Sequence, residues 1–152
     1  MKDTNFTRQE RTIMAWLKLC TGTFLFFGIA YAFIPFTLLK YINGLGLAFL
    51  GIVSASAGGI PSTEHVFSFW WAQSMGASAV VVYAAFQAQS DWLRHYALTP
   101  VIVVVKIFSA GFLIYLLLTQ PLQFYNIAFA LADGAVGLVT WIYYVKARQS
   151  RS

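Results

Sequence analysis

The scarcity of charged side chains is the feature that most restricts what this chain can fold into. Between Ile13 and Val145 only seven occur: Lys18, Lys40, Glu64, Asp91, Arg94, Lys106 and Asp133. A water-soluble domain has roughly a quarter of its residues charged and spreads them over its surface, whereas this chain has 10%. We therefore predict an integral membrane protein. The basic residues behind the net charge of +5 lie mostly in the two tails, where they indicate membrane topology and not nucleic-acid binding.

Four stretches are long and apolar enough for transmembrane helices, each of which needs about 20 mainly apolar residues. The predicted spans are residues 13–35, 66–88, 98–118 and 124–145. A polar tail, 1–12, precedes them and a basic tail, 146–152, follows them. We predict one all-α membrane domain of four transmembrane helices, in which short turns make the last three spans antiparallel neighbours.

Residues 36–65 are apolar but too interrupted to form a span. Lys40, Asn43 and several glycines break the run, and its longest clean core is residues 45–53. That core is well short of the length of about 20 residues that a spanning helix needs. Pro35 stops or kinks the preceding helix. We predict an interfacial or re-entrant helix, followed by a loop, between the first and second spans.

The residues before the first span carry the pattern of a helix N-terminus. Thr7 followed by Glu10 fits a capping box, which predicts that the helix starts near Arg8. Residues 30–32, Ala-Tyr-Ala, resemble the cleavage site of a signal peptide. The apolar run before them is nevertheless longer than the hydrophobic region of about 7–15 residues found in signal peptides. We expect the segment to be retained as a membrane anchor.

The distribution of basic residues distinguishes four spans from five. With four spans, one side of the membrane holds eight basic residues and the other holds Lys40 alone. The eight are Lys2, Arg8, Arg11, Lys18, Arg94, Lys146, Arg148 and Arg151. Because basic segments stay in the cytoplasm, we predict four spans with both termini cytoplasmic. A bacterial cytoplasmic (inner) membrane fits this compact architecture, and an organelle membrane is the alternative.

Lys106 and Asp133 are the charges that lie well inside predicted spans. Counted from the same membrane face, Lys106 is eight residues deep and Asp133 is twelve, or about 12 and 18 Å. An extended lysine covers the difference, and a lone charge within a bilayer is costly. We predict an ion pair, direct or through water. It either fixes the register of two helices or lines a cavity for a substrate, proton or headgroup, and the remaining alternative is a snorkelling Lys106 beside a protonated Asp133.

Small and polar residues share the faces that carry this pair. In the fourth span they recur at helical spacing at Asn126, Ala130, Asp133, Gly137 and Thr140. Such a face permits close approach of a neighbouring helix. Ser109 follows Lys106 by one turn, and the second span carries a comparable stripe of Gln73, Ala77, Ala84 and Gln87. We count Ser109, Asn126 and Gln73 with the pair as a candidate polar site, which leaves bulky residues such as Leu131, Leu138 and Ile142 for lipid or another subunit.

The remaining candidates for chemistry are weak. His65 and His95 lie at opposite ends of the second span and its hinge, where either could contact a haem or chlorophyll at a subunit boundary. We interpret both as interfacial anchors and predict no cofactor and no metal. Cys20 is expected to be a small buried hydrophobe. No nucleophile, zinc or phosphate-loop motif is present, so we do not predict an enzyme.

The first functional hypothesis is a non-catalytic accessory subunit of a larger membrane complex, or a self-associating membrane protein. Its motivation is the small size, the absence of catalytic motifs and the abundance of apolar surface for packing against other helices. The alternative is a protein that binds or transports a small molecule, lipid or proton at Lys106 and Asp133. A membrane enzyme acting on a lipid or isoprenoid is the third hypothesis and the weakest.

Overall fold

A computed structural model describes residues 6–51, 64–120 and 122–151, and for residues 35–36 and 64–73 it describes the backbone only. These segments are all helical. The elements are α1 (Arg8–Phe33), α2 (Pro35–Leu50), α3 (Glu64–Ser90), α4 (Trp92–His95), the short 3-10 helix η1 (Tyr96–Leu98), α5 (Thr99–Thr119) and α6 (Phe124–Gln149). The loop predicted after the interfacial helix falls largely on residues 52–63, outside the described residues.

The predicted boundaries of α1 are confirmed at both ends. Thr7 Oγ1 accepts a hydrogen bond from the backbone N–H of Glu10, and the Glu10 carboxylate accepts one from the N–H of Thr7. This reciprocal capping box starts the helix at Arg8. At the other end Ile34 leaves helical geometry and Pro35 begins α2. Proline suits this position because the first turn of a helix does not need its missing N–H.

Within the described residues, three helical stretches are long and apolar enough to cross a bilayer: α1, the run Trp92–Thr119 through α4 to α5, and α6. Their outward side chains are aromatic and aliphatic, with Phe33 82% and Leu118 81% exposed. Soluble proteins rarely expose contiguous apolar surface of this kind. The chain is therefore a helical multi-pass membrane protein. Its helices extend past the predicted spans, since α1 starts at Arg8 and α6 runs on to Gln149 with polar final turns.

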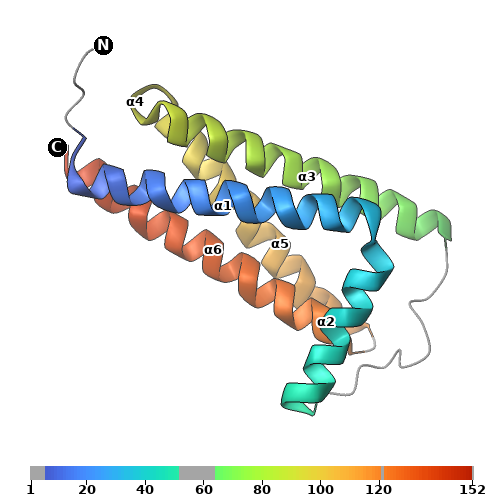
Figure 1. The fold of residues 1–152 in the computed structure, drawn as a ribbon. Coiled ribbons are helices and arrows are strands. Elements are labelled where there is room, and N and C mark those ends of the chain that lie inside the picture. Colours follow the sequence, from blue (N-terminus) through green and yellow to red (C-terminus); the bar gives the residue numbers. More distant parts are fainter. Residues whose placement is uncertain (1–5, 52–63, 121, 152) are drawn as a thin grey trace.

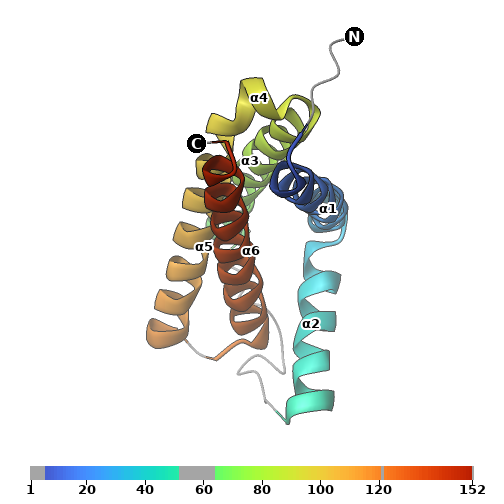
Figure 2. The ribbon, with the colours of Figure 1, turned by 90° about the vertical axis from the view of Figure 1, so that its left-hand side faces the viewer.

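The long helices form two antiparallel pairs that cross each other (Figures 1 and 2). One pair is α1 with α3, and the other is α5 with α6. Along the bundle α1 and α5 run in one direction while α3 and α6 return, so both described chain ends lie at the same end, beside α4 (Figure 1). The small element α2 turns sharply away from α1 and lies across the opposite end of the bundle.

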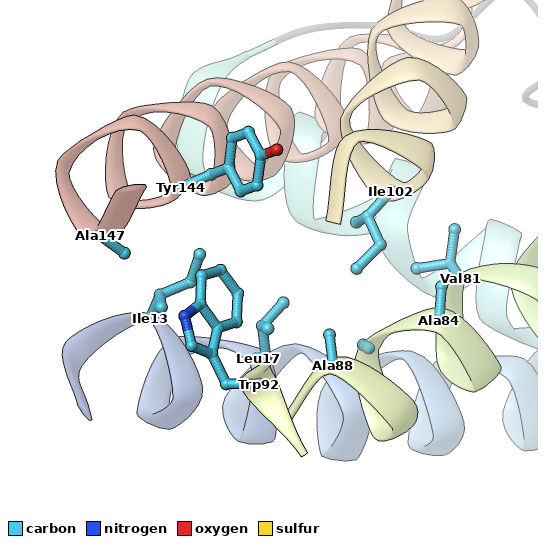
Figure 3. Packing of buried hydrophobic residues seen from close by; sticks show 10 residues of the cluster. Ile13, Leu17, Val81, Ala84, Ala88, Trp92, Ile102, Tyr144 and Ala147 are labelled. Atoms are coloured by element: carbon cyan, nitrogen blue, oxygen red, sulfur yellow. The ribbon is translucent and has the colours of Figure 1, made fainter. Parts of the chain in front are cut away.

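The buried hydrophobic core lies at the end that holds the chain termini. Figure 3 shows Trp92 beside Ile13 and Leu17 of α1 and facing Tyr144 and Ala147 of α6, while Val81 and Ala84 of α3 lie further along the cluster, near Ile102 of α5. The stripe predicted on α3 is wrong at Ala77, which is exposed. The buried face of α3 is Val81, Ala84, Ala85 and Ala88. Alanines are buried there because their small side chains let α1 approach closely. The predicted stripe differs because it is drawn through the two polar residues Gln73 and Gln87.

Two contacts join the chain ends. The buried Glu10 carboxylate, already part of the capping box, forms an ion pair with Arg151. Thr7 Oγ1 lies 2.9 Å from Ser150 Oγ, and Ser150 also donates to the carbonyl of Ala147. These terminal contacts tie the first turn of α1 to the residues that follow α6.

Candidate functional site

Lys106 and Asp133 lie in direct contact in the middle of the α5–α6 pair. Lys106 Nζ is 2.7 Å from Asp133 Oδ1, a distance that makes a charge-assisted hydrogen bond and an ion pair. The two side chains are 11% and 15% exposed, so the pair is nearly closed to its surroundings. Of the arrangements considered from the sequence, this geometry corresponds to a direct pair.

The close approach of α5 and α6 makes this contact geometrically possible. A Cβ at Gly137 would lie 3.0 Å from Cδ1 of Ile107 and 3.5 Å from Cβ of Lys106. One turn earlier, a Cβ at Gly134 would lie 3.8 Å from Cβ of Ala110. A larger side chain at Gly137 would push α5 away. The small-residue face predicted on α6 is confirmed, because Asn126, Ala130, Gly137 and Thr140 are all buried.

A third helix completes the surroundings of the lysine. Lys106 Nζ lies 4.0 Å from the centroid of the Phe24 ring on α1, which is a cation–π contact. Lys106 therefore connects α5, α6 and α1 at one point. The aromatic ring gives the ammonium a second favourable contact where water is scarce.

Two further polar contacts attach α1 to other helices. Both lie between the Lys106–Asp133 ion pair and the end of the bundle that holds the chain termini. Trp16 Nε1 donates to Thr140 Oγ1 over 2.8 Å, which links α1 to α6. Gln89 Nε2 donates to Thr21 Oγ1 over 3.2 Å, which links α3 to α1. Hydrogen bonds between helices are valuable in lipid, where an unpaired polar group has no water to replace its partner. These two bonds satisfy Trp16 Nε1 and Gln89 Nε2, whereas Gln89 Oε1 is buried without a hydrogen-bond partner among the described residues.

The structure separates the other residues of the predicted polar site. Ser109 is half-buried one turn from Lys106. Asn126 is buried on α6, but it precedes Asp133 by seven positions, or about 10 Å along the helix. Gln73 belongs to the part of α3 whose side chains lie outside the description. Lys106 and Asp133 are therefore brought together, with Ser109 adjacent and Asn126 distant.

The two histidines do not approach each other. His65 lies in the first turn of α3 and His95 ends α4, at opposite ends of the bundle (Figure 1). His95 is half-buried and its Nδ1 atom has no hydrogen-bond partner among the described residues. Among those residues there is also no group of three His, Cys, Asp or Glu side chains that could hold a metal ion. Cys20 is buried, as expected, and free.

The polar contact that attaches α2 to the start of α6 was not predicted from the sequence. Asn43 of α2 accepts a hydrogen bond at Oδ1 from the backbone N–H of Tyr125 and donates one to Gln123 Oε1, both over 3.0 Å. It thereby caps the N-terminus of α6 from another helix. Gly46 sits against Phe124, where a Cβ would lie 2.8 Å from Cβ of that residue. The available signal in the sequence is an amide and a glycine three positions apart in an apolar segment, where each also interrupts the apolar run.

Comparisons with protein-family models, with curated proteins and with solved structures find no match to this chain.

Proposed function

We propose that the chain is a four-span membrane protein that acts as a non-catalytic structural subunit of a membrane assembly. The fourth span is α3. Since α1 and α5 run in the same direction, the chain has to return between them, and α3 runs back along α1 (Figure 1). Its 27 residues make about 40 Å of helix, which exceeds the bilayer core of about 30 Å.

In this arrangement α2 is the interfacial helix. It lies across the bundle, so it runs along the membrane surface when the long helices cross the bilayer (Figures 1 and 2). Leu39 and Gly46 face the bundle and are buried, while Lys40, Tyr41 and Phe49 are exposed. A helix with a lysine and aromatic side chains on its outer face suits the lipid–water boundary.

The orientation follows from the basic side chains. Arg94, the first turn of α1 and the last turn of α6 all lie at the end of the bundle where the chain ends meet (Figure 1). Lys40 is the basic residue of α2 at the opposite end. The positive-inside rule therefore places both described termini in the cytoplasm. The contacts of Thr7 with Ser150 and of Glu10 with Arg151 support a shared side for the two ends.

The observation that carries the structural role is the closed Lys106–Asp133–Phe24 cluster. Intramembrane charges are candidates for ligand or ion sites by default. Here the bonding capacity of the ammonium is directed to a carboxylate and an aromatic ring of the same chain, and both charged side chains are nearly buried. The cluster joins three helices, which supports a role in fixing their register. The apolar outer surface, with Phe108 77% and Leu131 70% exposed, is available for packing against other membrane helices.

Purification in a mild detergent tests the subunit role. The tagged full chain should elute in a particle of fixed stoichiometry, with a protein mass well above the 17.0 kDa of one chain when measured by light scattering or native mass spectrometry. Recovery of a 17.0 kDa monomer across mild detergents and from native membranes would refute this role.

Thiol labelling separates the structural role from the alternative of a polar site open to water. Because Cys20 is the single cysteine, Cys20→Ser gives a cysteine-free background. In that background Ser109→Cys, one turn from Lys106, should resist a hydrophilic maleimide, while Ser150→Cys at the exposed chain end should react. Rapid labelling of Ser109→Cys would instead support binding or transport at the pair.

A further inference from the structure

Among the described residues, Lys18 differs from Lys106 in that no charged side chain pairs with it. It lies on the exposed face of α1, five residues into the apolar run, or about 8 Å from the start of that run. In the part of the chain that the structure describes, the two ion pairs involve Glu10 and Asp133, and no carboxylate pairs with Lys18. A cation at this depth on a lipid-facing surface is costly unless it reaches an anion or the headgroup layer.

A shallow hollow adjoins this lysine. Its volume is about 420 Å³ and it is lined by Lys18, Leu19, Gly22, Thr23, Phe26 and Phe27. Gly22 leaves the middle of the lining without a side chain, and a Cβ placed there would meet nothing within 4 Å. The hollow therefore has a cation at its cytoplasmic end under the proposed orientation, and mainly apolar walls further into the membrane.

Two more cations stand above the hollow. Arg8 and Arg11 are exposed in the first turn of α1, and Arg11 precedes Lys18 by seven residues, which is two helical turns on the same face. The separation of about 10 Å along the axis is shortened when Lys18 extends toward the headgroups. This surface presents a graded pattern in which positive charge lies near the membrane surface and an apolar trough lies below it.

We propose that this face of α1 binds one anionic phospholipid of the leaflet that surrounds the chain ends. Lys18 and Arg11 contact the phosphate and the acidic headgroup, and one acyl chain lies over Gly22 between Leu19 and Phe26. Charge complementarity identifies the occupant, because an apolar helix of another subunit would leave Lys18 without an anion. The site requires that α1 crosses the membrane, and it does not depend on the proposed role as a subunit.

Native mass spectrometry of the full chain measures this preference. The protein is purified in detergent and mixed with equal amounts of phosphatidylglycerol and phosphatidylcholine of identical acyl chains. The unmodified chain should retain more phosphatidylglycerol. Lys18→Gln should lower the ratio of bound phosphatidylglycerol to phosphatidylcholine about fivefold, the effect expected for one cation near the membrane surface. Lys18→Arg should keep the ratio, and Lys146→Gln, which removes an exposed cation at the same end of the bundle, should change it less than twofold.

Gly22→Leu tests the hollow separately from the charge. Because a Cβ at Gly22 meets nothing within 4 Å and leucine favours helix over glycine, this variant should fold with a melting temperature that is not lowered and still retain less of both lipids. Equal retention of the two lipids by the unmodified chain would overturn the proposal. So would equal effects of Lys18→Gln and Lys146→Gln. A smaller protein particle for Gly22→Leu would show that a helix of another subunit occupies the hollow.

Discussion

Breaking the Lys106–Asp133 pair from either side should produce unequal losses of stability that do not add. We consider Lys106→Met, Asp133→Asn and the double variant. Removing one member of a buried ion pair leaves the other charge uncompensated, at about 3–5 kcal/mol. The nearly complete burial of both side chains places this pair in that class.

The surroundings of each partner determine which single change is worse. Lys106→Met strands Asp133, which has no second polar partner among the described residues, so we expect a loss of about 4–5 kcal/mol. Asp133→Asn leaves Lys106 with the Phe24 ring and with an amide oxygen that still accepts a hydrogen bond. A cation–π contact away from water is worth about 2 kcal/mol, so the expected loss is about 2–3 kcal/mol. The double variant strands no charge and should lose less than Lys106→Met alone.

The free energy of unfolding can be followed in mixed micelles by titration with a denaturing detergent. Far-ultraviolet circular dichroism reports the helices, and the five tryptophans report tertiary contacts. A coupling energy of at least about 2 kcal/mol between the two substitutions is expected for groups in direct contact. Lys146→Met, at an exposed position, serves as the matched control and should change stability by less than about 0.5 kcal/mol.

Two outcomes would refute this reasoning. Additive losses would mean that the two side chains do not interact in the folded protein. A greater loss for Asp133→Asn than for Lys106→Met would mean that the Phe24 ring does not compensate the stranded ammonium.

The remaining predictions concern α2 and the chain ends. Gly46→Ala should destabilise the docking of α2 by about 1–3 kcal/mol through overpacking against Phe124; Gly44→Ala, where a Cβ meets nothing within 4 Å, should stabilise by up to about 1 kcal/mol. Thermal melting of the two variants checks this, and equal shifts would contradict it. Arg151→Gln should lower the stability by only about 1 kcal/mol. The Arg151 side chain that pairs with the buried Glu10 is about half exposed, so solvent weakens the ion pair. Addition of Glu10→Gln should cause little further loss, and two independent full losses would exclude the ion pair.

Features that depend on the membrane or on neighbouring residues were predictable from the sequence. The shortage of charge identified a membrane protein, and the Thr7 and Glu10 spacing located the first turn of α1. The contact of Lys106 with Asp133 followed from counting depth along two helices that a short turn forces to be antiparallel. In each case one local rule and a known chain direction were sufficient.

Contacts set by the relative placement of distant helices were not predictable. Helical periodicity tells which face of α1 is buried, but it does not tell that Phe24 lies over Lys106, because that depends on how the two helix pairs cross. The Asn43 cap on α6 depends likewise on the angle at which α2 leaves Pro35. One amide in an apolar segment indicates that some partner exists without identifying it.

The bond between Thr7 and Ser150 joins residues 143 positions apart, so its two partners are synthesised at different times. At a synthesis rate of about 5–20 residues per second, α1 waits roughly 7–30 s for the partner of its first turn. Its capping box needs only Thr7 and Glu10, so the newborn helix can hold its own first turn during that interval. The contact between the two chain ends is therefore a late step in biogenesis, and a ribosome stalled before residue 150 would leave the first turn of α1 without its bond to Ser150.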